Sequence, residues 1–224
     1  VGAIRRLSYV VYTSETNAFL AQLPLIQEKV VDILRSSPAD LVHAEVYLCM
    51  RVFLCRFASQ HLTGFWPIIL TEMVRILAQA KVDLPADKSD RLQLVFSVVK
   101  LADFLITLQT DDFQIHQWLF ITDTPDATNP ASFYMADSLL DCLAKFVSEC
   151  ERELVFDAND SLERAQQRRP LLQMSSVTTM STLQPFFATA SRAFYQCDFH
   201  APLDWDNINS CLLCDLFEPI RTNA

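Results

Sequence analysis

Glycine is nearly absent from this sequence, since Gly2 and Gly64 are the only two in 224 residues. Glycine supplies the positive-φ conformations that tight β-hairpins and phosphate-cradling loops use. Sheet-rich folds and nucleotide-binding loops are therefore disfavoured, and the G-x-S-x-G motif of many hydrolases cannot be formed. Because helices need little glycine, this scarcity favours an all-α fold.

Long apolar runs are also missing, because a helix that crosses a bilayer needs roughly 18 or more apolar residues. The best stretches, 65–70 and 95–108, are short or are interrupted by Lys100 and Asp103. No signal-peptide pattern opens the sequence, and it starts at Val1 without a methionine, so we expect a piece of a larger protein. Seven cysteines, an odd number, predict reduced thiols of an intracellular protein rather than a disulfide framework.

Positive charge is scarce over most of the chain, whose formal net charge is -9. Residues 1–81 hold eight Lys and Arg against six Asp and Glu, whereas residues 82–224 hold ten against twenty-one. Duplex nucleic acid is therefore not expected as a partner, because its binding needs many phosphate-neutralising cations. If the protein meets an anionic surface, the first third of the chain should make the contact.

Apolar residues recur at the spacing of three and four positions that is typical of helices. The stripes lie at 26–34, 42–57, 66–77 and 94–108, and further helices are expected from 111 to about 121, over 132–156, over 181–195 and over 208–217. The stretch 94–108 is apolar on most sides, which is typical of a helix packed between neighbours. The polar stretch 158–180 is expected to be a mobile loop.

The expected helices are joined by short turns, which favours antiparallel packing of neighbours. Helix starts near Ala18, Thr63 and Asp111 are about 45 to 48 residues apart, close to the period of HEAT repeats. Internal similarity between these segments is poor. The sequence therefore predicts one all-α domain over residues 1–224, built from antiparallel helices as irregular HEAT/armadillo-like repeats or as an irregular helical bundle.

One cysteine and histidine pattern has the spacing of a zinc site, and it consists of Cys197, His200, Cys211 and Cys214. Short paired spacings bring two soft ligands to one side of a zinc ion. The alternative is that Cys211 and Cys214 are small apolar residues of a helix, since leucines lie between them. We expect no metal and no other cofactor and keep the zinc-stabilised module as a weaker alternative.

Catalytic machinery is not recognisable in the sequence, although a triad assembled from distant residues stays open. None of the four histidines, His43, His61, His116 and His200, lies in a nucleophile motif. The pair Asp111–Asp112 is explained by the start of a helix, where acidic side chains are favoured by the helix dipole. We therefore expect a protein that is not an enzyme.

Two groups of residues are candidate binding sites. The candidates for an anionic lipid or an acidic partner are Arg5, Arg6, Arg51, Arg56 and Arg75, with Arg168 and Arg169 as a second basic pair. The candidates for partner contacts are Trp66, Pro67, Gln117 and Trp118, because exposed tryptophans often dominate binding energies. The alternatives are ordinary surface ion pairs for the arginines and packing between helices for the tryptophans.

Three segments carry a resemblance to a known family. They are 17–29, then 56–72 with the pattern L-T-x-x-W-P, and then 100–121 with the pattern F-Q-x-x-Q-W. Together they resemble the C-terminal region of the Dopey family, closely over about residues 5–123 and more loosely around 169–172 and 185–187. One departure is Ala58–Ser59, where the family pattern has Ser-Pro; it changes a helix break and affects no catalytic residue.

The resemblance implies the C-terminal fragment of a very large scaffold of helical repeats without enzymatic activity. It implies a cytosolic protein that is peripheral on Golgi and endosome membranes and acts in membrane trafficking. The implied partners are a giant scaffold related to the Arf exchange factors and a class IV P-type ATPase flippase. Phosphatidylinositol 4-phosphate is the implied lipid ligand, which leaves a membrane-recognition module as the alternative function. A homodimer also stays open.

Overall fold

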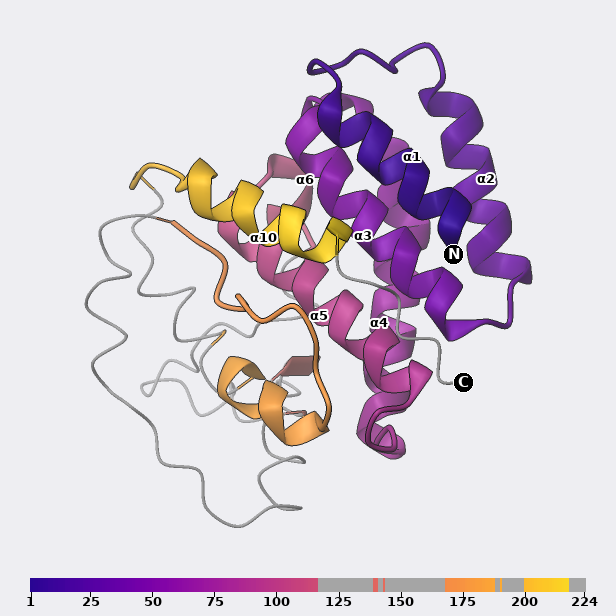
Figure 1. Cartoon of the computed structure of the whole chain (residues 1–224), viewed down its shortest axis with the longest axis vertical. Helices are drawn as coiled ribbons and strands as arrows, with labels where there is room; N and C mark the ends of the chain where they lie inside the picture. Colours follow the sequence, from indigo (N-terminus) through magenta and orange to yellow (C-terminus); the bar gives the residue numbers. More distant parts are fainter. Residues whose placement is uncertain (117–138, 141–142, 144–167, 188–189, 191–199, 218–224) are drawn as a thin grey trace, which may run out of the picture.

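The structure is a computed structural model that describes residues 1–116, 139–140, 143, 168–187, 190 and 200–217 (Figure 1). Its α-helices are α1 (Gly2–Thr13), α2 (Leu23–Ser36), α3 (Asp40–Arg56), α4 (Trp66–Val82), α5 (Asp90–Leu108), α6 (Asp111–Gln114) and α10 (Trp205–Phe217). The 3-10 turns are η1 (Ser59–His61), η2 (Thr63–Phe65) and η5 (Met180–Leu183). Within the described ranges the only β-pairing is one bridge between Arg168 and Leu203. The expected all-α class is confirmed.

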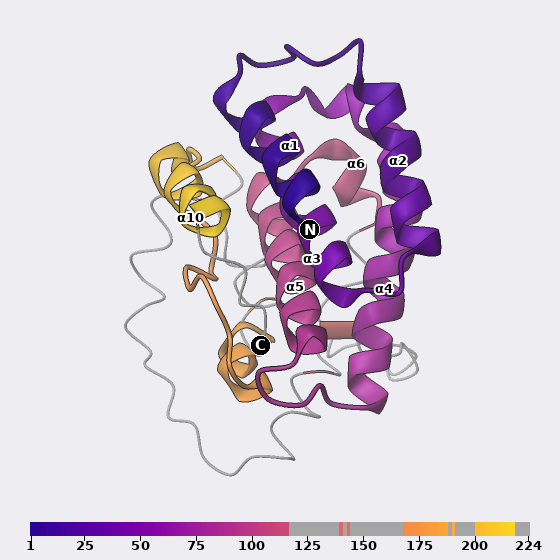
Figure 2. The same cartoon turned by 45° about the vertical axis from the view of Figure 1, so that its right-hand side comes forward.

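Helices α1, α3 and α5 form one layer and run in the same direction, while α2 and α4 lie along one side of them, on the right in Figure 2. Arg5 pairs with Glu45 near the starts of α1 and α3, and Tyr12 lies against Arg56 near their ends. In the same way Arg91 pairs with Asp40 where α3 and α5 begin. Each return helix therefore runs antiparallel to its chain neighbours, which is the arrangement of stacked helical pairs.

The core lies along α3 and α5. Helix α5 is buried almost continuously from Leu92 to Thr107, which confirms the expectation of a helix packed between neighbours. Helix α3 is buried from His43 to Leu54 and brings large side chains such as Tyr47 and Phe53 into the same core. No helix in the described ranges combines the length and apolar character that crossing a bilayer needs.

Several helix boundaries differ from the sequence-based expectation. Helix α2 begins at Leu23 rather than near Ala18, because Asn17 has a left-handed φ of 64° in the preceding turn and Pro24 fits the first helical turn. Thr63 opens η2, and α4 starts at Trp66. Helix α1 has no counterpart among the expected stripes, although Ile4, Leu7 and Val11 follow helical spacing and pack on the core.

Other expected elements are only partly described. Helix α6 ends at Gln114, and its expected continuation to 121 reaches residues outside the described ranges. The expected helix 132–156 lies outside them except for three leucines. Of the expected helix 181–195, residues 184–187 are helical and follow η5. Helix α10 ends at Phe217 as expected and begins at Trp205, three residues earlier than the expected start.

The stretch 168–187 lies against α5 and is held there by hydrogen bonds. The two carboxylate oxygens of Asp103 accept the backbone N–H groups of Leu171 and Leu172 at 3.0 and 2.8 Å. The side chain of Gln93 donates to the carbonyl of Val177 at 2.7 Å. This stretch contains no helix before Met180, and residues 158–167 of the expected loop lie outside the described ranges.

Candidate functional site

A buried group of charges joins three helices that are far apart in the sequence. Arg51 of α3 donates from Nη1 to Asp215 Oδ2 at 2.5 Å, and Lys100 of α5 donates from Nζ to Asp215 Oδ1 at 2.6 Å. The three side chains are only 3%, 5% and 6% exposed. Asp215 comes from α10, which crosses the outer face of the α1, α3 and α5 layer (Figure 1). We call these three residues the ion triad.

The ion triad holds two cations against one carboxylate. Aromatic rings support both cations, since the guanidinium of Arg51 lies 5.7 Å from the centre of Phe104 and Nζ of Lys100 lies 4.8 Å from the centre of Phe96. Burial and the charge of Arg51 lower the pKa of Lys100 below its ordinary value, against the opposing attraction of Asp215. Nε of Arg51 is buried without a hydrogen-bond partner.

A cavity of about 100 Å³ lies against the ion triad. Its wall includes a second ion pair, in which Arg5 of α1 contacts Glu45 of α3 through Nε at 3.0 Å and Nη2 at 2.5 Å. Ser97, Ser175 and Ser176 add hydroxyl groups to the wall. Among the described residues that line it, three side chains are cationic and two are carboxylates, so the lining favours an anion.

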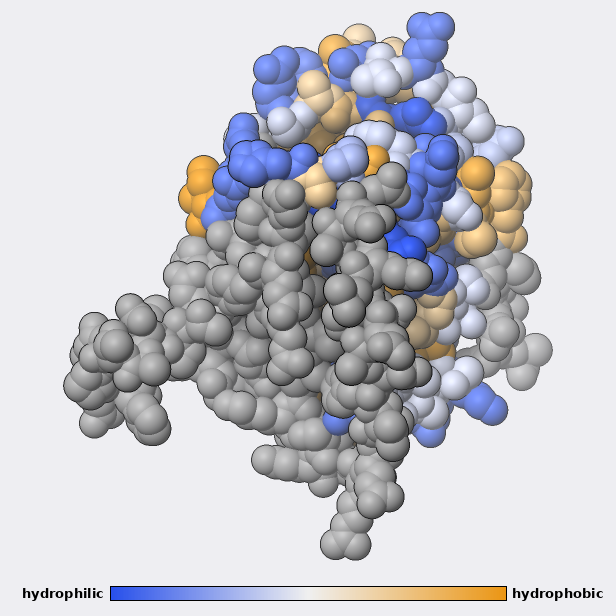
Figure 3. Space-filling view, turned by 90° about the vertical axis from the view of Figure 1, so that its left-hand side faces the viewer, coloured by the Kyte–Doolittle hydropathy of each residue, from blue (hydrophilic) through white to orange (hydrophobic). Residues whose placement is uncertain are grey.

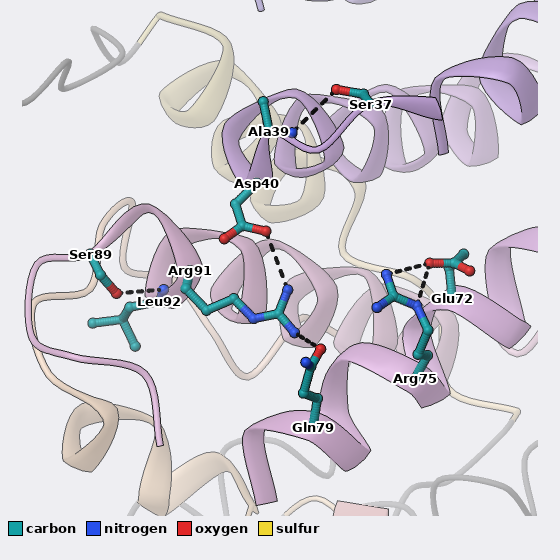
Figure 4. Close-up of polar contacts among 9 residues, drawn as sticks. All are labelled: Ser37, Ala39, Asp40, Glu72, Arg75, Gln79, Ser89, Arg91 and Leu92. Atoms are coloured by element: carbon teal, nitrogen blue, oxygen red, sulfur yellow. Dashed lines mark hydrogen bonds and ion pairs between the residues drawn. The ribbon is translucent and has the colours of Figure 1, made fainter. Parts of the chain in front are cut away.

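Only two of the five candidate arginines, Arg5 and Arg51, meet at this cavity. Arg6 is exposed on α1. The guanidinium of Arg56 lies 4.6 Å from the centre of the Tyr12 ring, with its Nε buried and unpartnered. Arg75 pairs with Glu72 on the exposed side of α4 at 2.7 Å (Figure 4). The second basic pair, Arg168 and Arg169, does not line this cavity, and Arg168 Nε donates to the carbonyl of Ala201.

Sequence reasoning missed Lys100 and Asp215 as site residues. The signal available for Lys100 was a charged residue inside an apolar stretch, which requires a buried partner. Asp215 offered a similar signal, because it lies between Cys214 and Leu216 in an apolar helix. Neither signal identifies the partner residue, because Lys100 and Asp215 are separated by more than one hundred positions in the sequence.

A surface network joins the starts of α3 and α5 to α4 (Figure 4). Arg91 contacts Asp40 at 3.2 Å and also donates to the side chain of Gln79. Burial raises the pKa of the nearby Tyr47 far above its ordinary value, and the charge of Glu72 adds to the rise. Since partly exposed pairs contribute little to stability, we interpret this network as positioning the helices.

The candidate aromatic contacts divide between core and surface. Trp66 is 3% exposed and packs in the core, which is the alternative role given to it above. Pro67 is exposed beside it, while Gln117 and Trp118 lie outside the described residues. A different aromatic pair is exposed, because Tyr9 of α1 meets Phe217 of α10 edge to face at 5.7 Å.

Of the candidate zinc ligands, Cys197 lies outside the described residues. Cys211 Sγ donates to Asn207 Oδ1 at 3.7 Å within α10, and Cys214 and His200 are exposed. Among the described side chains, no three His, Cys, Asp or Glu residues gather as a metal site. Burial raises the pKa of Cys49 and of Cys55 to about 12, so these thiols stay protonated near neutral pH.

The surface drawn in Figure 3 is mainly hydrophilic over the described residues, with apolar residues in small separate groups. The exposed large apolar side chains of α1 and α10 are Tyr9, Val10, Trp205, Leu213 and Phe217. Phe217 is 66% exposed. Exposed aromatic residues of this kind are suited to contacts with another protein.

Residues 1–199 match the family model described as DOP1 C-terminal. The chain belongs to the DOP1 family. This confirms the resemblance to the C-terminal region of Dopey proteins. The match covers α1 to α6 and the stretch 168–187, and therefore both Arg51 and Lys100 of the ion triad.

Relatives within the DOP1 family are similar to most of this chain. Protein pad-1 of Caenorhabditis briggsae is 30% identical over 198 residues, which are 84% of this chain and 8% of that protein. Protein DOP1B of Mus musculus is 27% identical over 226 residues, covering 85% of this chain and 10% of that protein. The chain thus spans about a tenth of the length of these curated relatives. No solved structure matches it.

Proposed function

We propose that this chain is a non-enzymatic scaffold domain of membrane trafficking between Golgi and endosomes. The observation that carries the proposal is the DOP1 family match over a stack of helical pairs. The buried charges of the described core are paired with one another across α3, α5 and α10, which fixes the helices in place. Stacked helical pairs present extended surfaces and are widely used to hold partner proteins.

The proposed partners are a giant scaffold related to the Arf exchange factors and a class IV P-type ATPase flippase. The proposed location is the cytosolic side of Golgi and endosome membranes, held there peripherally. Tyr9 and Phe217 are the side chains that we assign to partner contact, because they are exposed aromatics at the meeting of α1 and α10. Large aromatic side chains supply much of the binding energy at protein interfaces.

The test is co-precipitation of the two partners with the full-length protein that contains this domain. Tyr9→Ala combined with Phe217→Ala should reduce recovery of at least one partner about tenfold or more, since truncating a hot-spot aromatic costs about 2 kcal/mol or more. Leu25→Ala, an exposed apolar residue on α2, is the matched control. Unchanged recovery of both partners with the double variant would remove this surface from the proposal.

The second candidate function is recognition of phosphatidylinositol 4-phosphate on a membrane. It is favoured by Arg6, which is exposed on α1. Arg75 of α4 is 50% exposed and would have to exchange its pair with Glu72 for the lipid. Vesicles with and without this lipid should be sedimented with wild type and with Arg6→Glu/Arg75→Glu. Lipid-dependent binding that falls with salt and with the double variant supports membrane recognition. Equal binding to both vesicle types rejects it.

A further inference from the structure

The cavity beside the ion triad has an unbalanced lining. Arg5, Arg51 and Lys100 face it together with two carboxylates, Glu45 and Asp215, among the described residues. Arg51 and Lys100 are almost fully buried, and an excess buried charge is costly unless an opposite charge compensates it. A bound anion would supply that compensation.

Arg51, a residue of the cavity wall, has one buried donor without a partner. Nη1 of Arg51 serves Asp215, but Nε is buried and has no hydrogen-bond partner. Buried N–H groups are nearly always paired, and an orphaned one in a native protein often indicates an ion or water that completes it. A guanidinium is also the side chain best suited to hold phosphate oxygens, because its N–H groups form a planar fork.

The size of the cavity fits a small oxyanion. Its volume is about 100 Å³, and one water-sized occupant needs roughly 10–15 Å³ on such a measure, so about seven to ten occupants of that size are accommodated. Phosphate, with five non-hydrogen atoms, is within this limit. The hydroxyls of Ser97, Ser175 and Ser176 line the cavity and can donate to further phosphate oxygens.

We propose that this cavity binds a single phosphate group, held by Arg51 and Lys100 and completed by the serine hydroxyls. The site stands independently of the scaffold and membrane proposals, because its main cations are buried whereas Arg6 and Arg75 are exposed. Two sources can supply the group. One is free phosphate or a soluble phosphate ester.

The other source is the chain itself, because Ser175 is exposed and lines the same cavity. A serine kinase would transfer the γ-phosphoryl group of ATP to Ser175 Oγ, with loss of the hydroxyl proton and release of ADP. The new phosphate would bring about two negative charges to Arg51 and Lys100. Such charge-assisted contacts would fasten the stretch 168–187 to α3 and α5.

The experiment is calorimetric titration of the whole chain with inorganic phosphate, together with thermal unfolding at matched ionic strength in chloride. We expect one phosphate per chain and a rise in Tm of about 5–10 °C at a hundredfold excess over Kd. Phosphate also stabilises proteins in general by exclusion from their surfaces. The quantity to compare is therefore the rise in wild type beyond the rise in each variant.

Two variants separate loss of the site from loss of the fold. Lys100→Met removes a phosphate contact but leaves the pair of Arg51 and Asp215 intact. Ser97→Asp places a carboxylate that repels phosphate in the cavity and keeps all three side chains of the ion triad. Both should lose the titration signal and the additional rise in Tm. Lys29→Met is the matched control, because Lys29 is an exposed lysine on α2. Equal responses of wild type, Lys100→Met and Ser97→Asp would overturn the proposal.

A chain carrying phosphoserine at position 175 distinguishes the sources. If that chain has a higher Tm than the unmodified chain and no longer binds inorganic phosphate, Ser175 supplies the group. If it still binds one phosphate with unchanged affinity, the ligand is free. Absence of binding by the unmodified chain, together with no rise in Tm on modification, would refute the site for both sources.

Discussion

Replacing Asp215 by alanine should destabilise the domain strongly, because the change leaves Arg51 and Lys100 buried without a carboxylate. Both cations are at most 5% exposed, and they contact Asp215 at 2.5 and 2.6 Å. Removing one partner of a buried ion pair costs about 3–5 kcal/mol, most of it the penalty of the uncompensated charge. For a chain of this size, that loss lowers Tm by about 6–20 °C.

The assay is urea unfolding followed by circular dichroism, with Asp215→Ala compared with Asp32→Ala. Asp32 is the control because its ion pair with Lys29 is exposed, and exposed pairs contribute about 1 kcal/mol or less. Lys100→Met should cost less than Asp215→Ala, since it leaves one cation facing one carboxylate. The reasoning is refuted if Asp215→Ala and Asp32→Ala have the same free energy of unfolding, or if Lys100→Met is the most destabilising of the three.

Three further changes test other buried groups. The pKa of Lys100 is lowered in the folded state, so just below the ordinary value of 10.5 the unfolded chain binds more protons than the folded chain, and stability should rise with pH in that range. Urea unfolding of wild type and Lys100→Met at several alkaline pH values measures this rise. The same pH dependence in both proteins would contradict it. Tyr47→Phe should raise the free energy of unfolding by up to about 1 kcal/mol, because it removes a buried hydroxyl that has no partner. A fall in the free energy of unfolding by more than about 1 kcal/mol would show that the hydroxyl has a hydrogen-bond partner. Asp103→Asn should cost about 1–3 kcal/mol and speed amide exchange at Leu171 and Leu172, because an amide oxygen cannot replace two carboxylate acceptors; unchanged exchange would argue against these hydrogen bonds.

The apolar stripes of the sequence predicted α2, α3, α4 and α5. Helix α5 is buried nearly all round, and its stripe over 94–108 matches its central part. Helix α1 was missed although Ile4, Leu7 and Val11 follow one another at helical spacing and pack on the core. Helix α2 also buries only three residues and was predicted, so the number of buried residues does not explain the difference.

The charged residues were predicted less well than the helices. Arg51 was selected as a surface cation, yet it is 3% exposed, because it lies on a helix with neighbours on most sides. Its partner Asp215 lies 164 positions further along the chain. A sequence shows that a charged residue lies within an apolar segment, but the choice of partner depends on how distant helices pack.

Because Asp215 lies late in the sequence, the ion triad can form only late in the synthesis of the domain. Arg51 and Lys100 leave the ribosome long before α10, so the nascent chain holds two core cations without their carboxylate. The ion triad closes only when residue 215 is available. A premature stop codon before Trp205 would therefore do far more harm than the loss of one surface helix, because it would leave a nearly complete domain with two uncompensated charges at its centre.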